Sequence, residues 1–229
     1  MSKIPLTVII PVFNSDYYLD KLIKTIVEDV SEIIICDSFS TDRTLEIAKS
    51  YNLKVIQKKY INSATQKNWA IPQASQEWVW IIDSDELPEK LLINEIRAFI
   101  DNVNDDIHLA YIPRKNLFWG KFMFKASAYP DYQSRLFRKS KGRYQNKEVH
   151  AQVKVPGKIE YLSSALIHDD FKDISSWWQR NNRYYKYELN ECIKQNVSWS
   201  FKLQYIKPIY VFFKFYFIRR GFLYGFKGF

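Results

Sequence analysis

Residues 78–86, with the sequence Trp-Val-Trp-Ile-Ile-Asp-Ser-Asp-Glu, restrict the possible folds of this chain more than any other segment. A run of β-branched and aromatic residues is typical of a strand buried on both faces, as in a parallel sheet. The run ends in three carboxylates, Asp83, Asp85 and Glu86. We expect them at the carboxyl edge of the sheet, where open α/β folds bind their ligands.

Three neighbouring carboxylates indicate a bound cation. They would repel one another unless positive charge lies among them, and a hard divalent ion that also binds substrate phosphates meets this need. The alternative is a solvated acidic turn that caps a helix starting near Pro88, because acidic residues favour helix N-termini.

The first 113 residues alternate strand and helix patterns. Strands are expected at 7–12, 33–36, 54–57 and in the run that ends at Asp83, and helices at 15–30, around 41–48, at 64–71 and at 88–100. This order predicts a parallel sheet with right-handed crossovers. Later residues predict strands at 108–113, 133–138 and 149–155, a loop-like segment at 114–130, and a helix that ends near Glu191.

Length and cysteine content narrow the class of protein. A chain of 229 residues suits one α/β domain with an appendage. Cys36 lies in an apolar run and Cys192 is far from it, so we expect neither a disulfide framework nor a structural zinc site. The first residues do not resemble a signal peptide, which predicts a cytoplasmic protein.

The last part of the chain is basic and aromatic together. No acidic residue follows Glu191, whereas seven lysines and arginines do. The last part of the chain therefore carries seven of the nine net positive charges of the protein. The apolar stretches are shorter than the ~18 residues of a membrane-spanning helix. Aromatic rings with long cationic side chains suit a helix lying on an anionic membrane surface. The alternatives are a tail packed on the domain, or single-stranded nucleic acid; no base-reading motif supports the latter, so we expect no nucleic-acid partner.

Several enzyme classes fit poorly. There is no Gly-x-Gly-x-x-Gly or Walker loop for phosphates and no Gly-x-Ser-x-Gly elbow for a hydrolytic serine. A two-carboxylate glycoside hydrolase would leave the acidic residues at strand ends unexplained. Those residues are Asp37, the Asp83 and Asp85 pair, and Asp131.

Several motifs resemble inverting family 2 glycosyltransferases of the GT-A fold. Residues 8–14 resemble that family's first strand, residues 37–44 (Asp-Ser-Phe-Ser-Thr-Asp-Arg-Thr) resemble its Asp-Ser-Gly-Ser-Thr-Asp-Gly-Thr signature, and residues 83–85 resemble its Asp-x-Asp motif. Residues 66–70 (Gln-Lys-Asn-Trp-Ala) resemble the family's Lys/Arg-Asn-x-Ala element. Residues 129–138, 149–150, 167–168 and 207–229 are similar to the branch that adds a sugar to lipopolysaccharide inner core, the heptose β-1,4-glucosyltransferase type. The signature's two glycines are Phe39 and Arg43 here, so we expect an altered loop beside the base pocket.

The resemblance implies an α/β, GT-A Rossmann-like fold with a mixed, mainly parallel sheet, flanking helices and a C-terminal helical basic and aromatic extension. It implies a catalytic domain at 1–170, divided into a nucleotide-sugar half at 1–113 and an acceptor half at 114–170, followed by a membrane-associating extension at 171–229. The implied reaction transfers a hexose from a nucleotide-sugar, a UDP-sugar by expectation, to a membrane-linked glycan such as lipopolysaccharide core. Transfer to a polyprenyl phosphate and a non-enzymatic membrane or nucleic-acid binding role remain alternatives.

The same resemblance implies roles for single residues. Asp131 would be the catalytic base, and Asp83 and Asp85 would hold Mn²⁺ or Mg²⁺ with His150 as a further ligand. The nucleotide-sugar would be bound by eight residues: Pro11, Phe13, Asp37, Lys67, Asn68, Asp83, Arg135 and Arg138. From the sequence alone, His150 and His168 are each also consistent with structural roles. The extension would place the enzyme on the inner face of the cytoplasmic membrane, and the oligomeric state stays open.

Overall fold

The structure is a computed structural model that describes residues 2–118, 120–122, 129–147, 151–169, 174–194, 196 and 200–228. The chain forms two compact units. The first comprises Met1–Arg114 and Tyr132–His168, and the second comprises Lys115–Asp131 and Asp169–Phe229. How the chain divides into functional domains stays a prediction.

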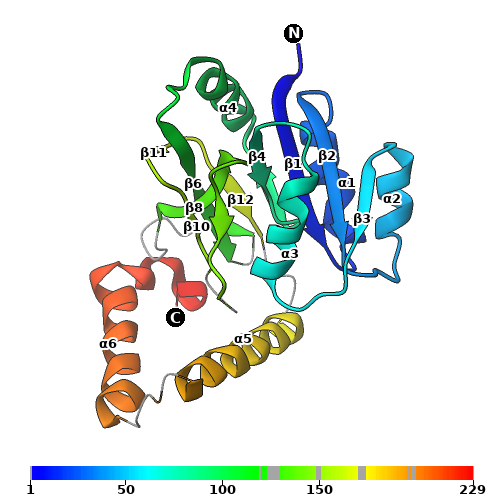
Figure 1. The fold of residues 1–229 in the computed structure, drawn as a ribbon. Helices are drawn as coiled ribbons and strands as arrows, with labels where there is room; N and C mark the ends of the chain where they lie inside the picture. Colours follow the sequence, from blue (N-terminus) through cyan, green and yellow to red (C-terminus); the bar gives the residue numbers. More distant parts are fainter. Residues whose placement is uncertain are drawn as a thin grey trace. The chain divides into compact units, whose positions relative to one another are not determined.

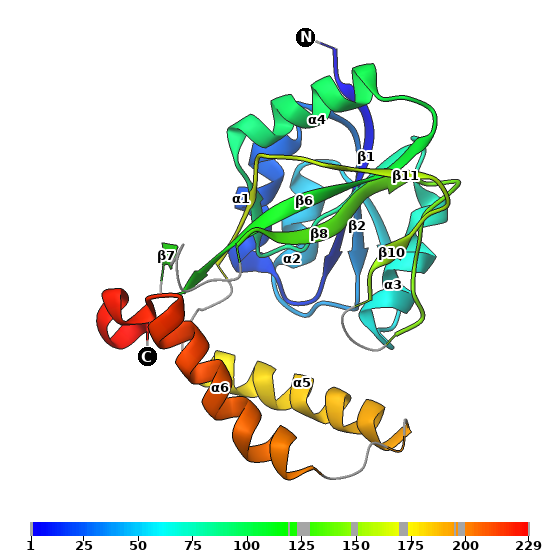
Figure 2. The same ribbon diagram turned by 90° about the vertical axis from the view of Figure 1, so that its left-hand side faces the viewer.

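Most strands among the described residues belong to one large twisted sheet (Figures 1 and 2). The strands are β1 (Ile4–Val12), β2 (Val30–Asp37), β3 (Lys54–Gln57), β4 (Trp78–Ile81), β5 (Glu86–Pro88), β6 (Ile107–Phe118), β7 (Lys121–Phe122), β8 (Asp131–Arg138), β9 (Arg143–Tyr144), β10 (Val153–Lys154), β11 (Lys158–Tyr161) and β12 (Leu166–His168). β6 and β8 begin or end in residues of the second unit, and β7 belongs to it.

The sheet is mixed and mainly parallel in its first half. Its order is β3-β2-β1-β4-β8-β6-β12-β5, with β11 and β7 also paired to β6. Strands β3, β2, β1 and β4 run parallel to one another, and β8 runs antiparallel to β4. β9 and β10 form a separate antiparallel pair. The predicted fold class is confirmed.

Helices cover both faces of this sheet (Figure 1). They are α1 (Asp16–Ile26), α2 (Thr44–Ser50), α3 (Ser63–Ala70) and α4 (Lys90–Asn102). Alternate side chains of β1 point to opposite faces. Val8 and Ile10 pack with the apolar side chains of α1, α2 and α4, whereas Ile9 packs with those of α3 and the β9–β10 pair.

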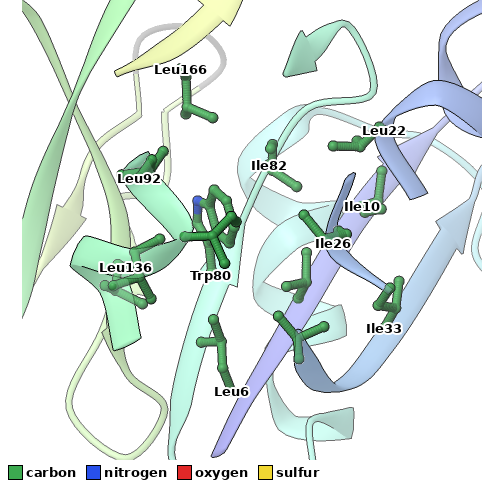
Figure 3. Close-up of a cluster of buried hydrophobic side chains, with 14 of the residues drawn as sticks. Leu6, Ile10, Leu22, Ile26, Ile33, Trp80, Ile82, Leu92, Leu136 and Leu166 are labelled. Atoms are coloured by element: carbon green, nitrogen blue, oxygen red, sulfur yellow. The ribbon is translucent and has the colours of Figure 1, made fainter. Parts of the chain in front are cut away.

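Trp80 of β4 lies in the middle of the larger apolar cluster and is fully buried. Figure 3 shows its ring between Leu92 and Leu136 on one side and Ile10 and Ile26 on the other. Burying a large aromatic side chain contributes about 1.5–3 kcal/mol. This packing fixes β4, and the loop that follows it carries the acidic motif.

One predicted boundary is wrong for a clear physical reason. The segment at Pro88 was expected to open a helix, but Glu86–Pro88 forms β5 and pairs with β12, and the helix begins at Lys90. Backbone hydrogen bonds to a strand almost 80 residues later in the chain outweigh the local preference of proline for a first helical turn. As a result, Glu86 lies beside His168 in the sheet.

The second unit contains α5 (Ile174–Lys194) and α6 (Lys207–Phe213), with π-helical turns on both sides of α6 at Lys202–Ile206 and Lys214–Ile218. Many of its apolar side chains are exposed, among them Trp178, Tyr185, Ile209, Phe213 and Ile218. Within the part of the chain that the structure describes, no helix is both long and apolar enough to cross a membrane.

Candidate active site at the carboxyl end of β4

Asp83 follows β4 and forms ion pairs with two cations. Lys67 Nζ of α3 lies 2.9 Å from its Oδ1, and Arg135 Nη2 of β8 lies 2.6 Å from its Oδ2. Burial alone would raise the pKa of this carboxyl group, but the charges of Arg135 and Lys67 outweigh burial and hold the pKa of Asp83 far below its usual range. Asp83 is therefore a carboxylate at any working pH.

Glu86 is the buried centre of the same cluster. Its side chain has no exposed surface, and its Oε1 lies 2.8 Å from Arg135 Nη2 and 3.4 Å from Arg114 Nη1. Its Oε2 accepts a hydrogen bond from the backbone N–H of Asp83 at 3.0 Å. Burial would lower the pKa of Arg135, but Asp83 and Glu86 raise it well above its ordinary value, so the guanidinium stays charged.

The register of the sheet brings these residues together. β8 runs antiparallel to β4 with Trp80 opposite Leu136, so Arg135 reaches the carboxyl end of β4. The cluster holds three cations, Lys67, Arg114 and Arg135, and two carboxylates, Asp83 and Glu86. Asp85, in the same turn, is a third carboxylate at this edge. The three cations therefore offset the acidic side chains, so an anionic ligand does not meet a strongly negative edge.

Asp85 is paired with a histidine. His168 Nε2 of β12 lies 3.5 Å from Asp85 Oδ2, and the Asp85 side chain is 32% exposed. Burial would lower the pKa of His168, but the hydrogen bond and charge of Asp85 raise it above its ordinary value. A carboxylate and an imidazole that face each other at a partly open edge are a common pair of divalent-metal ligands.

Asp37 ends β2 and is completely buried. Its carboxylate accepts hydrogen bonds from Phe39 N at 3.0 Å, Ser40 N at 3.1 Å, Ser40 Oγ at 2.5 Å and Gln57 Nε2 at 2.9 Å. These hydrogen bonds fix the turn after β2 on the Asp37 carboxylate. Pro11 lies in β1 opposite Cys36, and Phe13 follows that strand with 59% of its surface exposed.

The turns after β1 and β2 are joined to each other. Asn14 Oδ1 accepts from Thr41 N at 2.9 Å, and Ser40 Oγ accepts from Asn14 N at 2.9 Å. Phe39 stands where the related signature has glycine, and its φ of 63° is a left-handed conformation that glycine adopts without strain. Phe39 therefore has the backbone conformation of a glycine at this position, and its ring is exposed.

Glycosyl transferase family 2 matches residues 7–156, which include the whole β4 cluster. The chain belongs to this family. An uncharacterized glycosyltransferase of Rickettsia felis is 30% identical over 228 residues, covering 94% of this chain and 80% of its own length. The lipopolysaccharide core biosynthesis glycosyltransferase LpsC of Rhizobium meliloti is 28% identical, covering 99% of this chain and 86% of its own.

A solved structure supports the fold of this family 2 chain. Staphylococcus aureus TarS 1–349 in complex with UDP-GlcNAc superposes with a TM-score of 0.56 and 21% identity. The superposition covers 76% of this chain and 60% of the TarS chain, so this protein spans about three fifths of that length. The predicted family, the GT-A type of fold and the class of enzyme, a glycosyltransferase, are confirmed.

Not all predicted site residues meet in this family 2 chain. Arg138 lies opposite Trp78, at the amino end of β4, where its guanidinium stacks on the Trp78 ring and binds Asp105. Asn68 uses both ends of its amide on the backbone of Tyr144, at 2.9 Å each. Arg138 is thus outside the cluster, and Asn68 joins α3 to β9.

The remaining predicted residues are placed as follows. Asp131 begins β8, belongs to the second unit and accepts a hydrogen bond from Asn116 Nδ2 at 3.0 Å. His150 lies outside the described residues. Within the described ranges, no three His, Cys, Asp or Glu side chains gather into a ready metal site. Arg114 was not among the predicted site residues, and Glu86 was predicted only as one of three carboxylates at this edge. His168, whose role the sequence left open, pairs with Asp85.

Proposed function

We propose that this family 2 glycosyltransferase moves a hexosyl group from a UDP-sugar to a glycan or glycolipid acceptor, with inversion at the anomeric carbon. The observation that carries the proposal is the cluster at the end of β4, where three buried or half-buried cations surround Asp83 and Glu86. The acceptor oxygen attacks the anomeric carbon, its proton passes to a base, and the bond to the diphosphate breaks.

Lys67 and Arg135 are the proposed partners of the diphosphate. Both are held at Asp83 across 2.9 and 2.6 Å, so their positions are set before a ligand arrives. Preorganised cations stabilise the negative charge that develops on a leaving diphosphate, without reorganisation during the reaction. Asp83, with 34% of its side chain exposed, can accept a hydrogen bond from the donor's ribose.

Asp85 and His168 are the proposed protein ligands of Mn²⁺ or Mg²⁺. Both oxygens of Asp83 already contact cations, whereas the Asp85–His168 pair offers one oxygen and one nitrogen at 3.5 Å separation. This pair would hold Mn²⁺ more readily than Mg²⁺, which prefers oxygen ligands. When bound, such an ion would neutralise charge on the leaving diphosphate. His150 remains the alternative ligand predicted from sequence.

Asp131 is the proposed general base. It lies four residues before Arg135 in β8, and residues two and four apart in a strand share a face. The Asn116 amide, 3.0 Å away, orients its Oδ2. A carboxylate with one oriented oxygen can take the proton of an attacking hydroxyl group.

The proposed acceptor is a membrane-linked glycan of the lipopolysaccharide-core type. The relative LpsC is named for this biosynthesis and aligns with 99% of the chain. The exposed aromatic side chains of α6 and the cations Lys207, Lys214, Arg219 and Arg220 suit a peripheral position on an anionic, cytoplasmic membrane face. Polyprenyl phosphate is the alternative acceptor, and competition between lipid phosphate and core oligosaccharide separates the two.

The deciding experiment is a donor screen. The purified chain is incubated with UDP-, GDP- and CMP-sugars, with Mn²⁺, Mg²⁺ or chelator, and nucleotide release is measured. We expect turnover of a UDP-hexose that needs the divalent ion and is lost in Asp83→Asn. Absence of nucleotide release and of nucleotide binding with every donor would refute the proposal, whereas release that survives chelation would refute only its metal.

A further inference from the structure

Phe39 is an exposed aromatic residue in an unfavourable backbone conformation. It lies two residues after β2 with a φ of 63°, and 54% of its surface is exposed. A residue with a Cβ is strained in this region, and an exposed ring regains little through packing. Strained residues of this kind gather at ligand sites, where the surrounding structure holds them.

The surrounding structure holds Phe39 through its own backbone. The N–H of Phe39 donates to Asp37 Oδ2 at 3.0 Å, and the next N–H, of Ser40, donates to Asp37 Oδ1 at 3.1 Å. Asp37 is fully buried and also accepts from Gln57. The direction of the Phe39 side chain is therefore set by a rigid turn.

A second exposed ring leaves the neighbouring strand at the same edge. Val12 pairs with Asp37 in the parallel β1–β2 register, and Phe13 follows with 59% exposure. Asn14, with a φ of 50°, binds the turn after β2 through both its N–H and its side-chain oxygen. The two aromatic residues are thus carried on turns that are fixed to each other.

The order of the sheet relates these rings to the charged cluster. β1 lies between β2 and β4, so the ends of β2 and β4 are two strand spacings apart, about 10 Å. A nucleoside diphosphate is extended, with a flat base at one end and charge at the other. If the phosphates of such a ligand bind at Lys67 and Arg135, its base can lie at the end of β2.

On the basis of the proposed UDP-sugar reaction, we propose that Phe39 is a donor-binding residue that stacks on the nucleobase of the donor. The polar groups at this point, Asp37 and Ser40, make hydrogen bonds within the turn. The exposed rings of Phe39 and Phe13 are therefore the surface that this edge offers to a flat ligand. Stacking of one base on an aromatic side chain changes affinity by about tenfold or more. A donor lacking its base would gain nothing from Phe39.

The test uses titration calorimetry of the full chain with UDP and, separately, with inorganic pyrophosphate, both with Mn²⁺. Phe39→Gly removes the ring and suits a φ of 63°, so we expect an unchanged or higher Tm with about tenfold weaker UDP binding. Phe39→Tyr, which keeps an aromatic ring, should bind UDP as tightly as the unaltered chain. Pyrophosphate affinity should be the same in all variants. Tyr185→Ala, which removes another exposed ring, is the matched control.

Each outcome has a distinct meaning. If the unaltered chain binds UDP and Phe39→Gly binds it equally well, the role of Phe39 is refuted and the proposed function stands. If pyrophosphate affinity falls in parallel with UDP affinity, the ring does not act on the base and the inference is also refuted. If the unaltered chain binds none of UDP, GDP and CDP, the proposed function fails and the inference fails with it.

Discussion

Arg135 Nη2 donates to Asp83 Oδ2 across 2.6 Å from a side chain that is only 6% exposed. The same nitrogen lies 2.8 Å from Glu86, which has no exposed surface. One buried cation therefore balances two carboxylates, and the acidic motif depends on it for stability as well as for its chemistry.

Arg135→Met should destabilise the fold strongly. Removing one partner of a buried ion pair leaves an uncompensated charge and costs about 3–5 kcal/mol. The measurement is the free energy of unfolding in urea. A double-mutant cycle adds Glu86→Gln. The double variant should lose less stability than the sum of the two single variants, because glutamine at position 86 leaves no unpaired buried charge when Arg135 is absent. A loss below about 1 kcal/mol for Arg135→Met would mean that water reaches and solvates this cluster.

Asp85→Ala and His168→Ala should weaken Mn²⁺-dependent UDP binding while leaving the fold intact. The Asp85 side chain is 32% exposed, and its Oδ2 lies 3.5 Å from His168 Nε2. Removing this side chain therefore uncovers little buried surface. Loss of either side chain should lower apparent metal affinity by at least about tenfold, measured by Mn²⁺ titration of UDP binding. His150→Ala serves as the comparison. If it has the larger effect and His168→Ala has none, the ligand predicted from sequence is correct.

Glu95→Gln should lower stability at neutral pH and lose this effect in acid. Glu95 accepts the N–H groups of Ser163 and Ser164 at 2.8 Å each, tying α4 to the turn before β12. Burial raises the pKa of Glu95, but the hydrogen bonds from these two N–H groups lower it more, so its pKa lies below the ordinary value of a glutamate side chain. A lowered folded pKa stabilises the fold above the unfolded pKa, and the contribution is lost as pH falls through the folded value.

The expected size is about 1–3 kcal/mol at pH 7, as for hydrogen bonds to a charged group. Urea unfolding at pH 7 and near pH 3 checks it, with the exposed Glu46→Gln as control. An equal difference between wild type and Glu95→Gln at both pH values would contradict the assignment. Because β12 carries His168, the same variant should also weaken metal-dependent binding slightly.

Local sequence patterns predicted the elements of this fold well, because burial patterns are local. The third strand was predicted at 54–57 and occurs there. Contacts between elements far apart in the sequence could not be predicted from these local patterns. Arg135 and Arg138 look equivalent in sequence, but the pairing of Leu136 with Trp80 puts Arg135 at the acidic motif and Arg138 at the other end of β4.

The candidate site shows the same limit. Asp83, Asp85 and Lys67 were identified from motifs, and two of them are in direct contact. The sequence places Glu86 with Asp83 and Asp85 as one of three carboxylates around a bound cation, whereas its pairing with β12 buries it completely among protein cations. A buried carboxylate needs cations from other elements, and Arg114 and Arg135 come from strands whose register no local pattern encodes.

Asp131→Asn should keep nucleotide affinity and lose turnover. Asparagine retains the shape and the oxygen that accepts from Asn116, but it cannot take a proton. General-base loss lowers kcat by about 10²–10⁴-fold, measured as product formation at saturating donor. Asn116→Ala should lower kcat less and leave UDP affinity unchanged, because it only orients the base. Full turnover in Asp131→Asn would transfer the role of base to another group.

Replacing Lys207, Lys214, Arg219 and Arg220 by glutamine should weaken binding to anionic vesicles. Each cation near an anionic surface contributes about 1 kcal/mol, and the exposed rings of Tyr210, Phe213 and Phe217 would supply the apolar contact. Co-sedimentation with phosphatidylglycerol vesicles at low and high salt measures it. The control removes four exposed lysines of the first unit, Lys21, Lys49, Lys90 and Lys141. Because the two variants have equal net charge, equal loss of binding would show a nonspecific charge effect, whereas a loss confined to the first variant, with UDP affinity intact, would assign the membrane contact to the tail.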